Sequence, residues 1–138
     1  MITGLDHVAI AVSDLEQAIA RFAEDFGLTH VGTETVADAQ TTTAFFPLAG
    51  SQIELIYPYQ GQGPVAKHLS KRGPGLHHLC FRSDNLTKDM AQLSAKGYRF
   101  LSDAPRPGAH GTLTAFIHPK DTGGVLIELA QHPTTDPS

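Results

Sequence analysis

The stretch TAFIHPKDTGGVLIEL, residues 114–129, decides the fold, because its pattern is that of two strands joined by a turn. The pattern predicts strands at Thr114–Ile117 and Val125–Leu129, with a turn that contains Pro and Gly between them. The second strand carries a carboxylate, Glu128, between two aliphatic residues. Since an unpaired carboxylate is costly to bury, this acid predicts a partner that holds it.

The same pattern occurs earlier in the chain. Residues 43–55 read TAFFPLAGSQIEL, a hairpin with a shorter turn, and Glu54 stands where Glu128 stands in the later copy. Residues 76–81 (LHHLCF) match residues 5–10 (LDHVAI) at an offset of 71 residues. Two copies are too few for a solenoid, so we expect two modules that pair about a pseudo-twofold axis.

Hydrophobic periodicity and turn residues predict the order of the elements. The first module is expected to hold a strand at 5–12, a helix that Ser13 caps and Gly27 ends, and strands at 28–36, 43–46 and 52–56. A turn is expected at 38–40. The second module repeats this order with a strand at 76–81, a helix capped by Asp84 that ends near Gly97, and the hairpin at 114–129.

The sequence therefore predicts a single α+β domain over residues 1–138, built from two paired βαβββ modules whose eight strands curve around a metal cleft. The modules are expected at about 3–60 and 74–131. Residues 61–73 form a connection with a short helix from Pro64 to Gly73, and residues from Gln131 onward are expected to fray.

Composition narrows the class of protein. The chain is 41% hydrophobic and 17% charged with a net charge of −4, which argues against nucleic acid as a partner. One cysteine, Cys80, excludes an internal disulfide and fits a reducing compartment. No apolar run approaches membrane-spanning length, and the N-terminus lacks the pattern of a signal peptide. We therefore expect a cytoplasmic protein with no membrane partner.

The repeat also predicts the chemistry. His7 and His78 are equivalent, as are Glu54 and Glu128, so a pseudo-twofold would bring two imidazoles and two carboxylates to one point. Strand alternation chooses between the adjacent histidines, because His77 is equivalent to Asp6 and lies on the other face. This donor set suits a divalent ion, and Co, Ni, Zn, Mn and Fe(II) all remain open. An octahedral ion would keep two adjacent positions for a bidentate substrate.

The structural alternative is that each of these residues is an ordinary strand residue, since a single strand His is more often structural than a ligand. Four such residues at equivalent positions favour the metal site. Cys80 shares a face with His78 but is equivalent to Ala9, so we expect it to pack beneath the site. We expect His68 on the surface and His132 in the tail.

The modules and motifs resemble the vicinal oxygen chelate superfamily, to which glyoxalase I belongs. Within it the chain is most similar to the methylmalonyl-CoA epimerases, from about Leu5 to Gln131. The runs that carry the resemblance are LDHVAIAVSDLE (5–16), IELIYP (53–58), PVAKHLSKRGPGLHHLCF (64–81), PRPGAHG (105–111) and FIHPKDTGGVLIEL (116–129).

The resemblance implies an epimerase acting on (2R)- and (2S)-methylmalonyl-CoA, a Co- or Mn-like ion and a homodimer. Its ligands would be His7, Glu54, His78 and Glu128. The ion would stabilise the enolate formed when the α-proton leaves, with Glu128 as acid/base. The acid that relatives are thought to carry on the third strand aligns with Thr43, which is no base. A water, or a carboxylate of the 34–38 segment, would have to serve instead.

Few basic residues are available to bind the CoA phosphates and the substrate carboxylate. The candidates are Lys67, Lys71, Arg72, Arg106 and Lys120, together with His110 in a loop over the expected cleft, and Thr43 is expected beside the substrate. Two other functions stay open. One is a glyoxalase-I-type isomerase acting on a glutathione hemithioacetal. The other is a metal-free module that binds a small molecule such as an antibiotic. A ring-cleaving dioxygenase is disfavoured, since such enzymes typically use one carboxylate.

Overall fold

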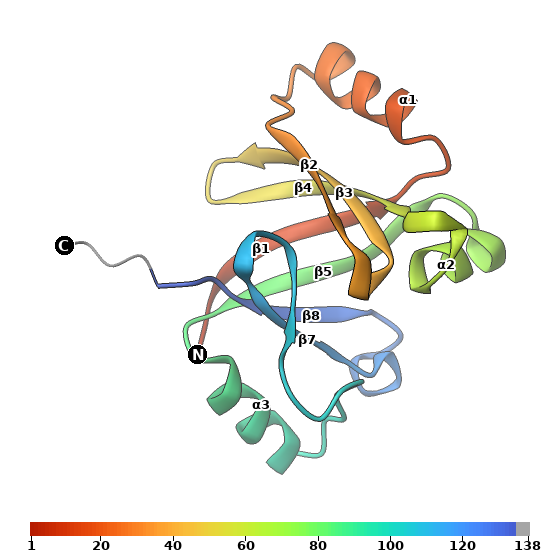
Figure 1. The fold of residues 1–138 in the computed structure, drawn as a ribbon. Helices are drawn as coiled ribbons and strands as arrows, with labels where there is room; N and C mark the ends of the chain where they lie inside the picture. The colour runs from red at the N-terminus through yellow and green to blue at the C-terminus, as the bar shows by residue number, and fades with distance from the viewer. Residues whose placement is uncertain (135–138) are drawn as a thin grey trace. The chain divides into compact units, whose positions relative to one another are not determined.

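The computed structural model describes residues 1–134, and its elements follow the predicted βαβββ order twice. Its strands are β1 (Ile2–Ala11), β2 (Gly32–Val36), β3 (Thr41–Leu48), β4 (Ser51–Pro58), β5 (Gly75–Ser83), β6 (Arg106–Pro107), β7 (Leu113–Ile117) and β8 (Ile127–Gln131). Its α-helices are α1 (Leu15–Ala20), α2 (Pro64–Arg72) and α3 (Leu86–Ala95) (Figure 1). Hydrogen bonding joins the eight strands in the order β2-β3-β4-β1-β5-β8-β7-β6. The predicted α+β class is confirmed.

The chain divides into two compact units. The N-terminal unit is His7–His78, and the C-terminal unit comprises Met1–Asp6 with the chain from Leu79 onward. These limits differ from the module limits at about 60 and 74 that the sequence repeat suggests, because the first residues of β1 and of β5 each group with the other module. The single-domain assignment stays a prediction.

Strand alternation in the N-terminal unit agrees with the predicted faces of β1. Val12 packs with Ala18 of α1 and with Phe46 of β3 in one core cluster. Ala9 and Ala11 belong to a second cluster, with Val65 of α2. The unit thus buries both faces of β1, and small Ala side chains line the face that carries His7.

In the C-terminal unit, α3 packs its predicted stripe onto the last hairpin. Leu86, Met90 and Leu93 cluster with Ala115 of β7 and Leu129 of β8. This spacing of three and four residues places the three side chains on one side of the helix. The hairpin therefore has one face committed to the core, and the parity of every residue along β8 follows from that.

The strand register shows that the repeat is present in the structure as well as in the sequence. In the N-terminal unit Glu54 lies between Ala9 of β1, in a parallel pair, and Phe45 of β3. In the C-terminal unit Glu128 lies between Cys80 of β5 and Phe116 of β7 in the same two kinds of pairing. The two carboxylates therefore occupy equivalent places in their units, as the offsets of 71 and 74 residues predicted.

Two predicted helix caps are wrong by one residue. The N-cap of α1 is Asp14 and not Ser13, because the Asp14 carboxylate accepts from the Gln17 amide at 3.0 Å. The N-cap of α3 is Asn85, while Asp84 accepts from the Met1 amino group at 2.8 Å. Both capping residues lie three positions before the amide they satisfy, and the sequence offers two adjacent candidates at each start.

Several strand limits also differ from prediction. β2 begins at Gly32 and not at residue 28, because the preceding chain forms a π-helical turn at Arg21–Asp25 and a reversal at Gly27 with φ +71°. β8 begins at Ile127, two residues later than predicted, since Gly123 and Gly124 both take positive φ and extend the turn. The turn at residues 38–40 and the helix from Pro64 to Gly73 are confirmed.

The expectation that the chain frays from Gln131 is wrong for its first residues. Gln131 ends β8, and its Oε1 accepts from the Leu86 amide at 2.7 Å. The His132 ring contacts the buried carboxylate of Asp6 through Nε2, and Arg82 donates to the same carboxylate. Residues 135–138 lie outside the described chain. Within residues 1–134, no helix is long and apolar enough to cross a membrane.

We expect Gln131→Met to destabilise the protein by about 1 kcal/mol, because it leaves the Leu86 amide at the start of α3 without its side-chain acceptor. Gln131→Glu is the matched control: it keeps an acceptor oxygen and places a negative charge at a helix N-terminus, so stability should be retained. Urea unfolding followed by circular dichroism measures both. Equal midpoints for Gln131→Met and wild type would contradict the capping role.

Candidate functional site

His7 and Glu54 form the buried polar pair of the N-terminal unit. Both are nearly inaccessible, with 6% and 9% of their surfaces exposed. Alternation along β1 places His7 on the face of Ala9, and Ala9 is the strand partner of Glu54, so the two functional side chains share a face. The Nδ1 atom of His7 lies 3.1 Å from Oε2 of Glu54.

The contact with Glu54 sets which nitrogen of His7 can bind a cation. A carboxylate accepts hydrogen bonds, so it favours the tautomer of His7 that carries its proton on Nδ1. The amide of Gln52, on the same face of β4, also donates to Oε2 of Glu54 at 2.9 Å. Glu54 thus supports His7 from its Nδ1 side and leaves the lone pair of Nε2 to act as a ligand.

His78 lies opposite that lone pair. Its Nε2 atom is 3.3 Å from Nε2 of His7, and the two rings meet edge to face at a centroid distance of 5.4 Å. Two nitrogens bound to one ion at about 2.0–2.1 Å with tetrahedral angles would be about 3.3 Å apart. The spacing therefore fits a shared divalent ion. This juxtaposition agrees with the parity argument that selected His78.

A second layer of histidines stands behind His78, and the sequence argument missed it. Nδ1 of His77 lies 2.7 Å from Nδ1 of His78, and the ring of His68, from α2, packs edge to face on His77 at 4.9 Å. Burial, followed by the nearby Arg72, lowers the pKa of His68 below its usual value. His68 is half-buried, so it keeps part of its predicted surface exposure while its ring packs on His77. The two adjacent histidines, His77 and His78, were the sequence feature that could have indicated this contact.

Glu128 is the carboxylate of the C-terminal unit. It lies on β8 with 7% of its surface exposed, beside the fully buried Cys80 and opposite Phe116. Cys80 packs here as a small side chain, in the place that Ala9 takes beside Glu54. The setting is apolar on both sides, so a carboxylate held here has few water molecules to compete with a ligand or a substrate.

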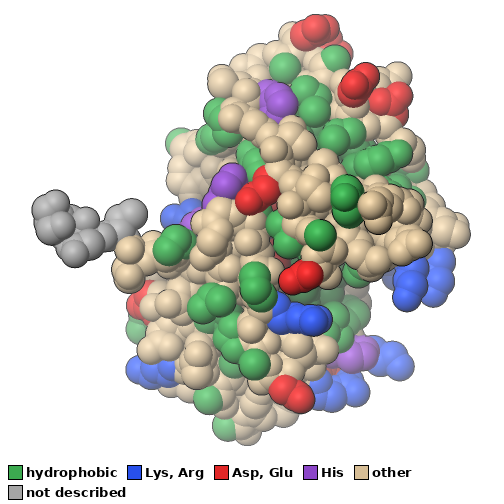
Figure 2. Space-filling view, in the orientation of Figure 1, with side chains coloured by type: hydrophobic (Ala, Val, Ile, Leu, Met, Phe, Trp, Pro, Cys, Tyr) green, Lys and Arg blue, Asp and Glu red, His purple; other side chains and the backbone are tan. Residues whose placement is uncertain are grey.

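The predicted substrate-binding residues fall in both units. Thr43 is buried on β3, with 6% exposed, and shares a face with Phe45. Arg106 lies on β6, His110 in the turn Ala109–Gly111 with φ +56°, and Lys120 in the turn Pro119–Thr122. The last three side chains are exposed. Figure 2 shows Lys and Arg side chains at several separate places on the face it presents, with acidic side chains among them. Their contact with substrate stays a prediction.

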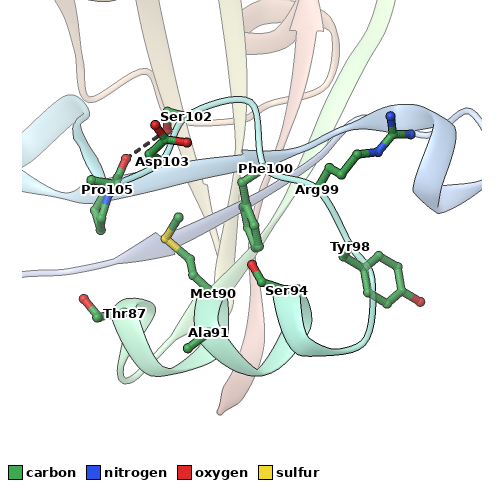
Figure 3. A pocket seen from close by; sticks show the side chains of 11 residues that line it. Thr87, Met90, Ala91, Ser94, Tyr98, Arg99, Phe100, Ser102, Asp103 and Pro105 are labelled. Carbon is green, nitrogen blue, oxygen red and sulfur yellow. Dashed lines mark hydrogen bonds between the residues drawn. The ribbon is translucent and has the colours of Figure 1, made fainter.

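A hollow of about 570 Å³ lies in the C-terminal unit between α3 and the chain at 98–105, and it contains none of the predicted site residues. Figure 3 shows Met90 and Phe100 facing each other across it. At its edge Arg99 donates to Asp121 at 2.9 Å, and this hydrogen bonding lowers the pKa of Asp121 to about 2. Arg99 is thus committed to a structural ion pair.

Comparison with known proteins places the chain in a defined group. Residues 6–116 match the model of the Glyoxalase/Bleomycin resistance protein/Dioxygenase superfamily. The chain is 38% identical to the ethylmalonyl-CoA/methylmalonyl-CoA epimerase of Cereibacter sphaeroides, over 95% of this chain and 99% of that one. The crystal structure of methylmalonyl-CoA epimerase from Mycobacterium tuberculosis is 38% identical, with a TM-score of 0.92 over 96% of this chain and 90% of that one.

A further solved structure shows a methylmalonyl-CoA epimerase in complex with methylmalonyl-CoA and NH4+. It is 32% identical to this chain, with a TM-score of 0.92 over 99% of each chain. Because these likenesses span nearly the whole chain, the eight-stranded fold predicted from the repeat is also the fold of these enzymes.

We expect His78→Ala to lower the affinity for Co(II) by about 100-fold or more, because it removes one of the two facing Nε2 donors. His77→Ala should lower it less, by about 10-fold, since His77 only orients His78. His30→Ala, on an exposed ring, is the control and should bind as wild type. Isothermal titration with Co(II) measures all three. Normal binding by His78→Ala with loss in His77→Ala would contradict the assignment.

Proposed function

Because the chain belongs to the Glyoxalase/Bleomycin resistance protein/Dioxygenase superfamily and, within it, to the methylmalonyl-CoA epimerases, we propose that it interconverts (2R)- and (2S)-methylmalonyl-CoA. The observation that supports this most directly is the pair of facing imidazole nitrogens, 3.3 Å apart, on a face that also carries a buried carboxylate. Epimerisation requires a proton to leave C2 and another to return to it. A site with two imidazoles and a carboxylate can stabilise the negative charge that develops on the substrate when the proton leaves.

His7, Glu54, His78 and Glu128 would hold a divalent ion, with Co, Mn, Ni and Zn as the candidates. The facing Nε2 atoms of His7 and His78 support this proposal by their spacing, and the equivalent register positions of Glu54 and Glu128 add the two carboxylates. A bound ion would draw negative charge from the thioester and carboxylate oxygens of the substrate and so make its α-proton more acidic.

Glu128 has two roles in this proposal, as a ligand and as the group that accepts the α-proton. Its carboxylate is held in an apolar strand between Cys80 and Phe116, which restricts its rotamers and excludes water from the proton it moves. Glu54 has a different role, because His7 and Gln52 both contact its Oε2 atom. It fixes the orientation of His7 and moves no proton.

Recognition of the CoA part would depend on exposed cations of the C-terminal unit. Arg106 and Lys120 carry the positive charge, and His110 stands in a turn between β6 and β7. Phosphate groups bind such side chains through charge-assisted hydrogen bonds. In the N-terminal unit, Thr43 offers a hydroxyl on the face of Glu54 and would contact the acyl part of the substrate.

We also infer a homodimer in the cytoplasm. Cys80 is the one cysteine of the sequence and is fully buried, which suits a reducing compartment. Leu5 and Leu76 are equivalent in the repeat, and both are exposed, at 40% and 73%. Large apolar side chains exposed at equivalent strand positions favour an interface between copies of the chain. Sedimentation equilibrium tests the oligomeric state.

The activity is tested with (2R)- and (2S)-methylmalonyl-CoA supplied separately to the purified protein, with Co(II) and after chelation. We expect interconversion with the ion and its loss after chelation, restored by added Co(II). The glutathione hemithioacetal of methylglyoxal is the comparison substrate for a glyoxalase-type activity. Turnover of that substrate, with methylmalonyl-CoA untouched, would contradict the proposal.

We expect Glu128→Gln to reduce proton exchange at C2 by about 100-fold or more while bound Co(II) falls only modestly. The amide oxygen still coordinates, but an amide does not accept the α-proton. Glu54→Gln is the matched control, since its amide oxygen still accepts from His7, and it should keep most of the activity. Exchange in D2O is followed by NMR with bound metal quantified. Equal losses in both variants would mean that Glu128 is a ligand only.

A further inference from the structure

The turn between β7 and β8 lies within the C-terminal unit and carries several polar side chains. It runs from His118 through Thr122, and it contains Lys120, one of the exposed cations proposed to bind the CoA part. We propose that His118 binds the phosphate groups of the substrate together with Lys120. The Arg99–Asp121 ion pair is a positioning element that holds this turn in place. The assignment deepens the proposed function, on which it rests, by naming residues that recognise the nucleotide end of CoA.

Hydrogen bonding at the start of the turn decides which nitrogen of His118 donates. The Nδ1 atom of His118 accepts from the Lys120 amide at 3.2 Å, so the ring caps the turn. Because an accepting nitrogen carries no proton, the proton of the neutral ring lies on Nε2. Nε2 is the ring nitrogen that does not contact this amide, and the side chain is half-buried. His118 therefore directs an N–H donor away from the backbone of the turn.

Lys120 brings a positive charge to the same turn, and its side chain is exposed. The neighbouring carboxylate is Asp121, and both of its oxygens accept from the Arg99 side chain. Oδ2 accepts from Nε at 3.0 Å, and Oδ1 accepts from Nη2 at 2.9 Å. Since Arg99 neutralises Asp121, the charge of Lys120 stays available to an anion. An ammonium group has three donors and binds phosphate as a point charge.

The chemistry of a phosphate group matches this pair of donors. A phosphate presents several strong acceptor oxygens and a negative charge, so a cation and an N–H group both contribute to its binding. The two side chains stand two positions apart, and the hydrogen bond from the Lys120 amide to the His118 ring ties them together. The turn therefore presents a charge and an N–H donor from one rigid element.

Residue 99 fixes the turn from outside. The Arg99 carbonyl accepts from the His118 amide at 2.7 Å, and the Arg99 amide donates to Oδ2 of Asp121 at 2.8 Å. With the two bonds from the guanidinium, four hydrogen bonds join Arg99 to the turn. Figure 3 shows the Arg99 side chain extending away from Met90 and Phe100. Arg99 thus contributes to the turn and not to the hollow beside α3.

The ion pair persists at the pH of an ordinary assay. Hydrogen bonds from the Arg99 side chain, and then from its backbone amide, lower the pKa of Asp121 to about 2. A carboxyl group with so low a pKa is ionised at neutral pH, and a guanidinium stays protonated there. The turn is therefore held in one geometry whenever substrate binds.

The test compares two substrates on the Co(II)-loaded protein. One is methylmalonyl-CoA, and the other is methylmalonyl-pantetheine, which has the same thioester but no phosphate group. We expect Lys120→Gln to raise KM for methylmalonyl-CoA by about 10-fold and His118→Asn by about 5-fold, with kcat within about 2-fold of wild type. For methylmalonyl-pantetheine, KM should stay within about 2-fold of wild type in both variants.

The substitution by Asn separates the two roles of His118. The Asn oxygen still accepts from the Lys120 amide, because Asn is a good capping residue, but the shorter side chain places no N–H at the position of Nε2. Lys96→Gln is the matched control for loss of a positive charge, since Lys96 is an exposed lysine at the end of α3 in the same unit. It should keep the wild-type KM for both substrates.

The positioning role is tested by combining Arg99→Gln with Asp121→Asn. This double variant removes the ion pair and leaves the net charge of the turn unchanged, so a change in KM reports lost positioning and not lost charge. We expect KM for methylmalonyl-CoA to rise by about 3-fold, while kcat and the KM for methylmalonyl-pantetheine stay within about 2-fold of wild type. A merely structural role would not distinguish the two substrates.

A binding measurement separates phosphate recognition from catalysis. Adenosine 3′,5′-bisphosphate is the probe, because it carries phosphates of the nucleotide end and no acyl group. In isothermal titration, Lys120→Gln should bind the probe about 10-fold more weakly than wild type and with a smaller dependence on salt.

Two results would overturn the phosphate contact. One is a wild-type KM for methylmalonyl-CoA in both Lys120→Gln and His118→Asn, and the other is an equal rise in KM for both thioesters. If the wild-type protein epimerises neither thioester, the proposed function is overturned. Weaker probe binding by Lys120→Gln would then still support the phosphate contact, and unchanged probe binding would overturn it.

Discussion

The structure depends on a carboxylate buried in the middle of an apolar strand. Glu54 has 9% of its surface exposed, between the small Ala9 and the large Phe45, and a charge in that place is unfavourable without partners. His7 and Gln52 supply them, both at Oε2. The strand pairing that brings these side chains together therefore also offsets the cost of burying the carboxylate. The fold and the site thus depend on the same pairing.

The same requirement explains why the site is built on strands and not on loops. A one-residue slip in register would move Glu54 to the opposite face, where Phe46 and Leu55 form a closed core with α1. Since that core tolerates no charge, the register is strongly specified. His7, at the start of the N-terminal unit, and His78, at its end, are thereby held with their Nε2 atoms 3.3 Å apart.

The histidines behind the site extend this order outward. His77 was set aside by strand parity, and parity is right that it does not share the face of His78. Yet its ring nitrogen reaches the Nδ1 of His78, and His68 packs against its ring. Strand alternation predicts the face of the sheet to which each side chain points, but it does not predict how far the atoms of a long side chain extend. Residues such as His77, which orient a ligand from a neighbouring position, are therefore not found by strand alternation alone.

The sequence by itself determined the repeat, the α+β class, the equivalence of His7 with His78 and the equivalence of Glu54 with Glu128. It could do so because the alternation of strand residues and the turn residues are local patterns, and both occur twice in the chain at a nearly constant spacing. The helix starts were less certain, since Ser13 and Asp14 are both good caps and only the backbone geometry chooses between them.

Only the tertiary structure decided which strands are neighbours and in which register. That pairing sets Glu34 across from Thr43, assigns Oε2 of Glu54 to Nδ1 of His7, and gives Gln131 a helix to cap. Each of these contacts joins side chains through a hydrogen-bonded ladder or across a helix end, and the residues lie between 9 and 47 positions apart. No local sequence pattern predicts contacts between residues so far apart in the sequence, because these contacts form only when the chain folds and its strands pair.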